Sequence, residues 1–189
     1  SDTLYCDSAF FYQEQNSVEA FGDVAIYQAD GTTAFAEYMR YTGNNKKVFM
    51  RSIDGDVELS DGKGSTLWSK EIYYDLASKT GIYKRGGTLQ SDATILSSMN
   101  GIYNLKTKDA RFQNNVEVND PEYHVISGDL GYNTATKVVR FFGPSVVTND
   151  KSILQTSNGV YNTITRTSHF TDRSSILNES QYIEADTLD

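Results

Sequence analysis

The chain has 189 residues, a hydrophobic content of 38%, and a formal net charge of −8. Its length corresponds to about one domain, and its apolar and aromatic content excludes a disordered chain. An acidic chain without a cluster of Lys and Arg neutralises phosphates poorly, so nucleic acid is not an expected partner. Its apolar runs are shorter than the 18 or so residues of a transmembrane helix.

A six-residue pattern recurs along the chain: Tyr, then Asp or Asn, two variable residues, Ser or Thr, and Lys or Arg. In its clearest copies it starts at Tyr74, Tyr103, Tyr132 and Tyr161, at intervals of 29 residues. Earlier anchors at Tyr12 and Tyr41 extend the series with spacings of 29 and 33. A period of this size indicates stacked structural repeats.

The repeat sets the expected organisation of the chain. Six units fill Leu4 to Ser180, and Gln181–Asp189 resembles the start of a seventh. A single unit buries too little apolar surface to stand alone, so the units must stack. We therefore interpret residues 1–189 as a single β-repeat domain that is part of a longer protein.

Each unit is predicted to consist of short antiparallel strands. The 13 Tyr and 9 Phe favour strands, and Asp or Asn followed by Ser or Thr after each anchor favours tight turns. The apolar alternation changes parity about three residues before the anchor, as at Asn100 and Asp129. A parity change in a strand predicts a β-bulge or bend there. The fold class is all-β: an elongated, open two-sheet stack of antiparallel hairpins.

The repeated tyrosines are interpreted as architectural, because cross-strand aromatic pairs stabilise sheets. The repeated cations that close each motif are expected to form a solvated row along one edge of the stack rather than an anion site. These cations are Lys79, Lys108, Lys137 and Arg166.

Several stretches resemble the OstA/LptA family. They are "LYCDSAFFY" (Leu4–Tyr12), the segment Gly22–Tyr41, the segment Gly55–Asp75, and the tail "EADTLD" (Glu184–Asp189). The later units drift from the Gly-Asp-Val element of this pattern, for example "NNVEV" at Asn114–Val118.

The resemblance implies a periplasmic protein of lipopolysaccharide transport with a twisted β-jellyroll fold, and no enzyme. It implies lipopolysaccharide, through lipid A, as a ligand whose acyl chains lie along the interior. It further implies head-to-tail association with related domains or with itself, and a place between the membranes that can include the outer membrane. Whether the chain is the bridge or the soluble part of an outer-membrane partner stays open.

The residues by themselves predict a continuous apolar trough, which is a sandwich core if two sheets close and a groove if they splay. Burying an acyl chain is worth up to about 0.8 kcal/mol per methylene, so a groove needs no polar anchor to hold a lipid tail. The candidate lining residues are Val57, Leu59, Leu67, Leu89, Leu96, Val116, Val118, Val125, Val146 and Leu154.

Catalysis, a cofactor and a metal are not expected. The two histidines, His124 and His169, are outside any metal-ligand spacing, and Cys6 is alone, so it forms no internal disulfide. Two other classes remain: a parallel β-solenoid that binds or cleaves surface polysaccharide, and an adhesin or scaffold of stacked β repeats. The hairpin turns favour antiparallel pairing and therefore disfavour the solenoid.

Overall fold

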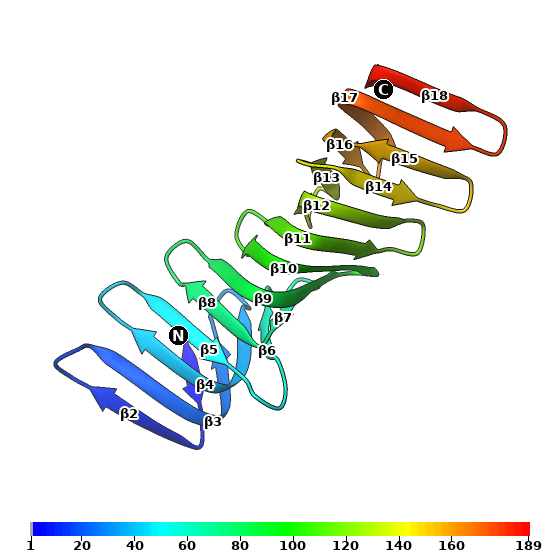
Figure 1. Cartoon of the computed structure of the whole chain (residues 1–189). Coiled ribbons are helices and arrows are strands. Elements are labelled where there is room, and N and C mark those ends of the chain that lie inside the picture. The colour runs from blue at the N-terminus through cyan, green and yellow to red at the C-terminus, as the bar shows by residue number, and fades with distance from the viewer. Residues whose placement is uncertain (1) are drawn as a thin grey trace.

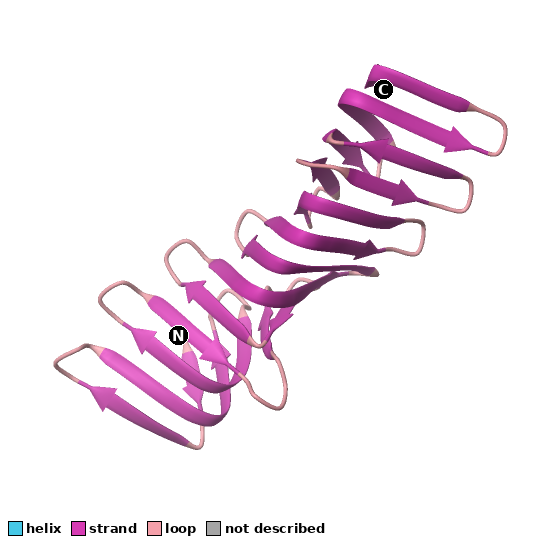
Figure 2. Cartoon of the chain, in the orientation of Figure 1, coloured by secondary structure: helices cyan, strands magenta, loops and turns pink. Residues whose placement is uncertain are grey.

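The computed structural model describes residues 2–189, and every regular element in this range is a β-strand (Figure 2). None of these residues therefore forms a helix that is long and apolar enough to cross a membrane. The strands are β1 (Thr3–Tyr5), β2 (Ser8–Tyr12), β3 (Ser17–Tyr27), β4 (Thr33–Thr42), β5 (Lys47–Arg51), β6 (Val57–Ser60), β7 (Ser65–Ser69), β8 (Glu71–Asp75), β9 (Thr80–Ser91), β10 (Thr94–Asn104), β11 (Asp109–Asn119), β12 (His124–Asn133), β13 (Val138–Phe141), β14 (Ser145–Thr148), β15 (Ser152–Thr156), β16 (Asn158–Asn162), β17 (Thr167–Asn178) and β18 (Tyr182–Leu188).

All 18 strands belong to one antiparallel sheet, which confirms the predicted all-β class of stacked hairpins and excludes a parallel solenoid. Figure 1 shows the elongated, twisted stack, with β2 and β3 at one end and β17 and β18 at the other. The sheet is folded lengthwise into two layers, because the long strands bend in the middle. In β3, for example, residues 17–21 pair with β2 and residues 25–27 pair with β1.

We call the two layers layer one and layer two. Layer one holds the complete strands β2, β5, β8, β13 and β16, and layer two holds β1, β6, β7, β14 and β15. The long strands contribute one half to each layer. The layers are therefore joined at the bends and end at two free edges formed by hairpin turns.

The bends coincide with the bulges that the parity change predicts. In β3 the register shifts between Phe21 and Val24, and Gly22 and Asp23 there have φ values of 68° and 40°. In β11 the shift follows Gln113, and Asn114 and Asn115 have φ values of 63° and 53°. Gly, Asn and Asp tolerate this left-handed conformation, which explains why they recur at the bends.

At the bends, buried hydroxyl groups donate hydrogen bonds to backbone carbonyls. Ser98 Oγ donates to the carbonyl of Asn100 at 2.7 Å, and Thr156 Oγ1 donates to the carbonyl of Asn158 at 3.1 Å. Ser127 Oγ also lies 2.7 Å from Ser145 Oγ, so hydroxyls from neighbouring strands meet there. A buried carbonyl freed by a bulge needs a donor, which accounts for the Ser or Thr five residues before each of the last four anchor tyrosines.

The anchor tyrosines form one row on the inner side of layer one and alternate with small residues. Tyr103 pairs with Gly81 on one side and Ala110 on the other. The first unit departs from the prediction, because Phe11, not Tyr12, occupies the anchor position opposite Val18. Tyr12 instead pairs with a residue at the strand end.

Candidate binding groove

The inner side of layer two carries an unbroken row of apolar side chains, one from each strand of the layer. Consecutive members are direct cross-strand partners, as in the series Leu67, Leu89 and Leu96. We call this set the inner row. It consists of Leu4, Ile26, Ala34, Leu59, Leu67, Leu89, Leu96, Val118, Val125, Val147, Leu154, Ile176 and Ile183.

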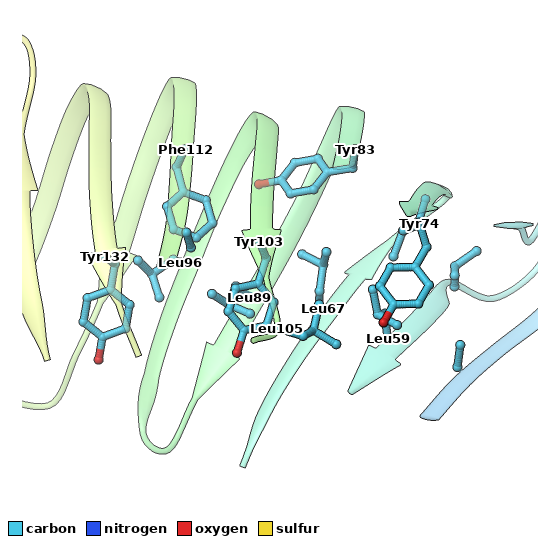
Figure 3. Packing of buried hydrophobic residues seen from close by; sticks show 14 of the residues in the cluster. Leu59, Leu67, Tyr74, Tyr83, Leu89, Leu96, Tyr103, Leu105, Phe112 and Tyr132 are labelled. Carbon is cyan, nitrogen blue, oxygen red and sulfur yellow. The ribbon is translucent and has the colours of Figure 1, made fainter. Parts of the chain in front are cut away.

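Layer one covers the inner row with aromatic rings (Figure 3). Tyr83, Tyr103 and Phe112 are each 1% exposed. The layers approach closely at Gly81, where an added Cβ would lie 2.8 Å from Leu59 Cδ2 of the facing layer. Glycine at this position lets the two layers touch.

Most of the predicted lining residues are buried between the layers. Those at most 3% exposed are Val57, Leu59, Leu67, Leu89, Leu96, Val116, Val118 and Val125. Leu154 is half-buried and packs against the same cluster. Contact between these residues and a lipid is still a prediction.

Val146 is wrongly predicted. It is 37% exposed on the outer side of β14, whereas its neighbour Val147 pairs with Val125 and Leu154 in the inner row. Ser127 of β12 has Ser145 as its partner on one side and Val116 as its partner on the other. Ser145 is therefore the counterpart of the buried Val116. The side chains of β14 that point to the interior are therefore those of Ser145 and Val147. The sequence does not reveal this, because the Gly-Pro turn before β14 shifts the alternation by one residue.

The interior is hollow near its two ends. Toward the C-terminal end a cavity of about 200 Å³ is lined by Tyr123, Val125, Phe141, Leu154 and Phe170, among others. Toward the N-terminal end a cavity of about 250 Å³ has Leu4, Ile26, Met39, Tyr41 and Val48 in its wall. Both cavities include members of the inner row, whose terminal residues Leu4 and Ile183 are 38% and 46% exposed.

The middle of the interior is filled by the protein's own side chains. Leu59, Leu67 and Leu89 have no exposed surface, and Leu96 is 1% exposed. Both end cavities are smaller than the roughly 300–1,000 Å³ of sites that enclose a drug-sized ligand. The arrangement can therefore seat part of one apolar chain at each end, and a ligand that runs through the middle requires the two layers to move apart.

The free edges of the two layers are joined by a series of ion pairs, which we call the cross-edge ion pairs. In each, the cation that closes a repeat motif in layer one meets an acid in a turn of layer two. The pairs, with their N–O distances, are Lys79–Asp30 (2.9 Å), Lys108–Asp61 (2.6 Å), Lys137–Asp92 (2.7 Å) and Arg166–Glu122 (3.1 Å).

These pairs correct the expectation of a solvated row of cations. The side chains of Lys79, Lys108 and Lys137 are only 24%, 16% and 21% exposed, and Arg166 alone, at 69%, is solvated. All four turn cations share a left-handed backbone, with φ between 56° and 66°, so this conformation alone does not account for the burial of the three lysines. The three lysine side chains lie against the facing layer, where each contacts an acid.

Asp61 makes the most buried of these pairs, with a side chain that is 2% exposed. Burial alone would raise its pKa, but hydrogen bonds from Lys108 and from the backbone amides of Lys63 and Ser65 outweigh burial and hold the pKa below its ordinary value. Tyr103 Oη also donates to Asp61 Oδ2, at 2.9 Å. Burial raises the pKa of Tyr103 to about 12, so its hydroxyl stays protonated and available as a donor.

The same two-donor arrangement recurs one unit earlier. Lys79 Nζ and Tyr74 Oη both point at Gln28 Oε1, at 2.9 Å and 3.3 Å. Lys79 also holds Asp30, and this hydrogen bond lowers the pKa of Asp30 from 3.8 to about 2. A tyrosine hydroxyl and an ammonium five residues later therefore converge on oxygen atoms of the opposite edge.

The acids of the cross-edge ion pairs escaped the sequence interpretation. A signal was present, because Asp30, Asp61, Asp92 and Glu122 follow one another at intervals of 31, 31 and 30 residues. Each lies in a turn of layer two, where an acid is also an ordinary turn residue. Pairing with a cation more than 40 residues away cannot be deduced from such local composition.

The two histidines and the cysteine lie apart from one another. Residues 2–189 contain no cluster of three or more His, Cys, Asp or Glu side chains that could hold a metal ion. His124 lies 3.0 Å from Glu117 on an exposed part of the sheet, and Cys6 is half-buried and unpaired in this same range. What the site offers is an apolar interior with a row of charged pairs along its edge.

Comparison with known proteins points to one family. A family model described as "OstA-like protein" matches residues 1–129 and 125–186. No curated protein matches the chain. Among solved structures, the chain is similar to LptH, titled the LptA homologous periplasmic component of the conserved lipopolysaccharide transport device from Pseudomonas aeruginosa. The identity is 13% and the TM-score 0.31, over 74% of this chain and 80% of that one.

Proposed function

The chain belongs to the OstA-like protein family, and from this premise we propose that it is a non-catalytic, periplasmic carrier of lipopolysaccharide in outer-membrane biogenesis. In this proposal the acyl chains of the lipid lie against the inner row and its aromatic cover. The inner row supports the proposal most strongly, because it crosses the whole stack and is exposed at both ends.

The energetics favour an apolar ligand in such a groove. Each methylene that leaves water contributes up to about 0.8 kcal/mol. The acyl chains enter from the end cavities, and the closed middle opens as the layers separate. Binding in the middle thus competes with the protein's own core contacts.

The carrier associates end to end with a second copy or with another OstA-like domain. Within residues 2–189, β1 and β2 each pair with β3 alone, and β18 pairs with β17 alone. Sheet edges of this kind recruit further strands. Strand addition at both ends extends the inner row from one domain into the next.

Photo-crosslinking tests the proposal directly. A photoreactive amino acid at Leu96, Val125 or Val147 is expected to crosslink to lipopolysaccharide in cells, and the same group at Val146 on the outer side serves as the matched control. Crosslinks from interior positions and none from Val146 support the proposal. A folded protein that crosslinks from no interior position, or from Val146 equally well, refutes it.

End-to-end association has its own test. Light scattering of the purified chain is expected to show particle length rising with protein concentration. A strict monomer at high concentration contradicts strand addition between copies.

A further inference from the structure

The lysines of the cross-edge ion pairs belong to the same hairpins as the anchor tyrosines, and together they form a repeated donor site. Lys108 Nζ and Tyr103 Oη lie 2.6 Å and 2.9 Å from a single oxygen, Asp61 Oδ2. Lys79 Nζ and Tyr74 Oη converge in the same way on Gln28 Oε1. Two donors aimed at one oxygen, one of them cationic, make a strong site for an anionic oxygen.

In the closed protein that oxygen comes from the opposite edge. The interior beneath it is full, so a ligand that occupies the middle must part the layers and break these pairs. A buried ammonium that loses its only acid is costly. Lys108 and Lys137, at 16% and 21% exposure, then need a replacement anion at the rim of the groove.

We propose that Lys79 and Lys108, together with Tyr74 and Tyr103, and Lys137 at the equivalent position of the next hairpin, bind the phosphate or carboxylate headgroup of an amphiphile whose acyl chain occupies the groove. The headgroup oxygen takes the place of the acid, so opening of the edge and recognition of the ligand are one exchange reaction. This inference rests on the proposed function, because it requires a chain in the groove.

The repeat geometry fits an anion that moves along the stack. Successive lysines are two strands apart, and neighbouring strands are about 4.8 Å apart, so the donor sites follow one another at about 10 Å. The exchange leaves each lysine paired before and after the ligand passes. The row therefore selects anionic over uncharged amphiphiles of the same chain length.

The pair Lys137–Asp92 is the best one to test, because Asp92 is 71% exposed and can be neutralised at little cost to the fold. We use two probes below their micelle concentrations: dodecyl phosphate, and dodecyl maltoside with the same chain and an uncharged headgroup. Titration calorimetry measures the affinity of each probe for the native chain and for the Lys137→Gln and Asp92→Asn variants. Lys106→Gln, an exposed lysine in a neighbouring hairpin turn, is the control, and urea unfolding verifies that each variant is folded.

The two variants break the same ion pair but should shift phosphate binding in opposite directions. Lys137→Gln should lower the affinity for dodecyl phosphate by about tenfold, which is the effect of losing one charge-assisted hydrogen bond. Asp92→Asn should raise the affinity for dodecyl phosphate, because this substitution removes the acid that competes with the headgroup for Lys137. Dodecyl maltoside should respond alike to both variants, and Lys106→Gln should bind both probes as the native chain does.

Other outcomes overturn the inference. If both variants change the affinities for the two probes in parallel, the lysines only hold the edge closed. If inorganic phosphate alone binds as tightly as dodecyl phosphate, the site does not depend on a chain in the groove. If neither probe binds the native chain, the groove proposal fails together with this one, whereas binding without headgroup preference overturns this inference alone.

Discussion

Lys108 Nζ lies 2.6 Å from Asp61 Oδ2 and joins the turn after β10 to the turn after β6, 47 residues earlier in the chain. The contact connects the two layers at their free edges, opposite the bends. Both side chains are mostly buried, and the acid accepts further hydrogen bonds from Tyr103 and from two backbone amides. Separation of the layers therefore has a defined electrostatic cost at this point.

Loss of the cation should destabilise the closed protein. Lys108→Met leaves Asp61 buried without its counterion, and removal of one partner of a buried pair typically costs about 3 kcal/mol or more. Urea unfolding should show this loss as a lower transition midpoint at an unchanged slope. Lys106→Met, in the same turn but exposed, should change the free energy of unfolding by less than about 0.5 kcal/mol. Equal effects of the two substitutions would contradict the importance of the pair.

The edge should also weaken in acid. The pKa of Asp30 in the folded protein is about 2, below the value of 3.8 for an unperturbed Asp. A depressed folded-state pKa adds stability that is complete above the unfolded value and is lost as the pH falls through the folded value. The free energy of unfolding should therefore fall between about pH 4 and pH 2.

Asp30→Asn checks the source of this loss. The variant should have a shallower decline between about pH 4 and pH 2 than the native chain. Asp150→Asn, at an exposed turn, is the matched substitution and should keep the native decline. A decline of the same steepness in the Asp30→Asn variant would rule out the Lys79–Asp30 pair as its origin.

The repeat was readable from the sequence because it rests on local chemistry. The period, the strands, the bulge near Asn100 and the turns all follow from short-range patterns of apolar, β-branched and turn-forming residues. The anchor in the first unit was misplaced by one residue, because Phe11 and Tyr12 are both aromatic and only the pairing with Val18 distinguishes them.

Other features depend on contacts that no local pattern records. Val147, and not Val146, faces the interior, because Ser145 occupies the inward position after the Gly-Pro turn. The partners of the repeated lysines are more than 40 residues away and belong to the other layer. Closure of the middle likewise depends on how near the layers approach, which side-chain identity alone does not determine.

The inward and outward positions of layer two should differ in their sensitivity to truncation. Leu96 is 1% exposed and Val146 is 37% exposed. Leu96→Ala should cost about 2–5 kcal/mol, as removal of buried methylenes leaves a cavity, whereas Val146→Ala should cost less than about 1 kcal/mol. Denaturant unfolding of the two variants measures both losses in the free energy of unfolding. A larger loss for Val146→Ala would contradict the assignment of the inward and outward faces.

Gly101 should be intolerant of even one added carbon, for a steric and not a conformational reason. A Cβ there would lie 2.3 Å from Tyr83 Cε1, whose ring is buried and also packs over Gly87. Gly101→Ala should therefore destabilise the fold by about 1–3 kcal/mol, the usual range for overpacking. Gly128→Ala is the control, because a Cβ at Gly128 meets nothing within 4 Å.

A double-mutant cycle separates the steric cause from any intrinsic effect of alanine in a strand. In the Tyr83→Leu background the ring is gone, so Gly101→Ala should cost much less than in the native background, with a coupling of about 1 kcal/mol or more. Tyr83→Phe keeps the ring and removes only the hydroxyl, so it should leave the cost of Gly101→Ala nearly unchanged. Additive effects of Tyr83→Leu and Gly101→Ala would show that the ring does not set the requirement for glycine at this position.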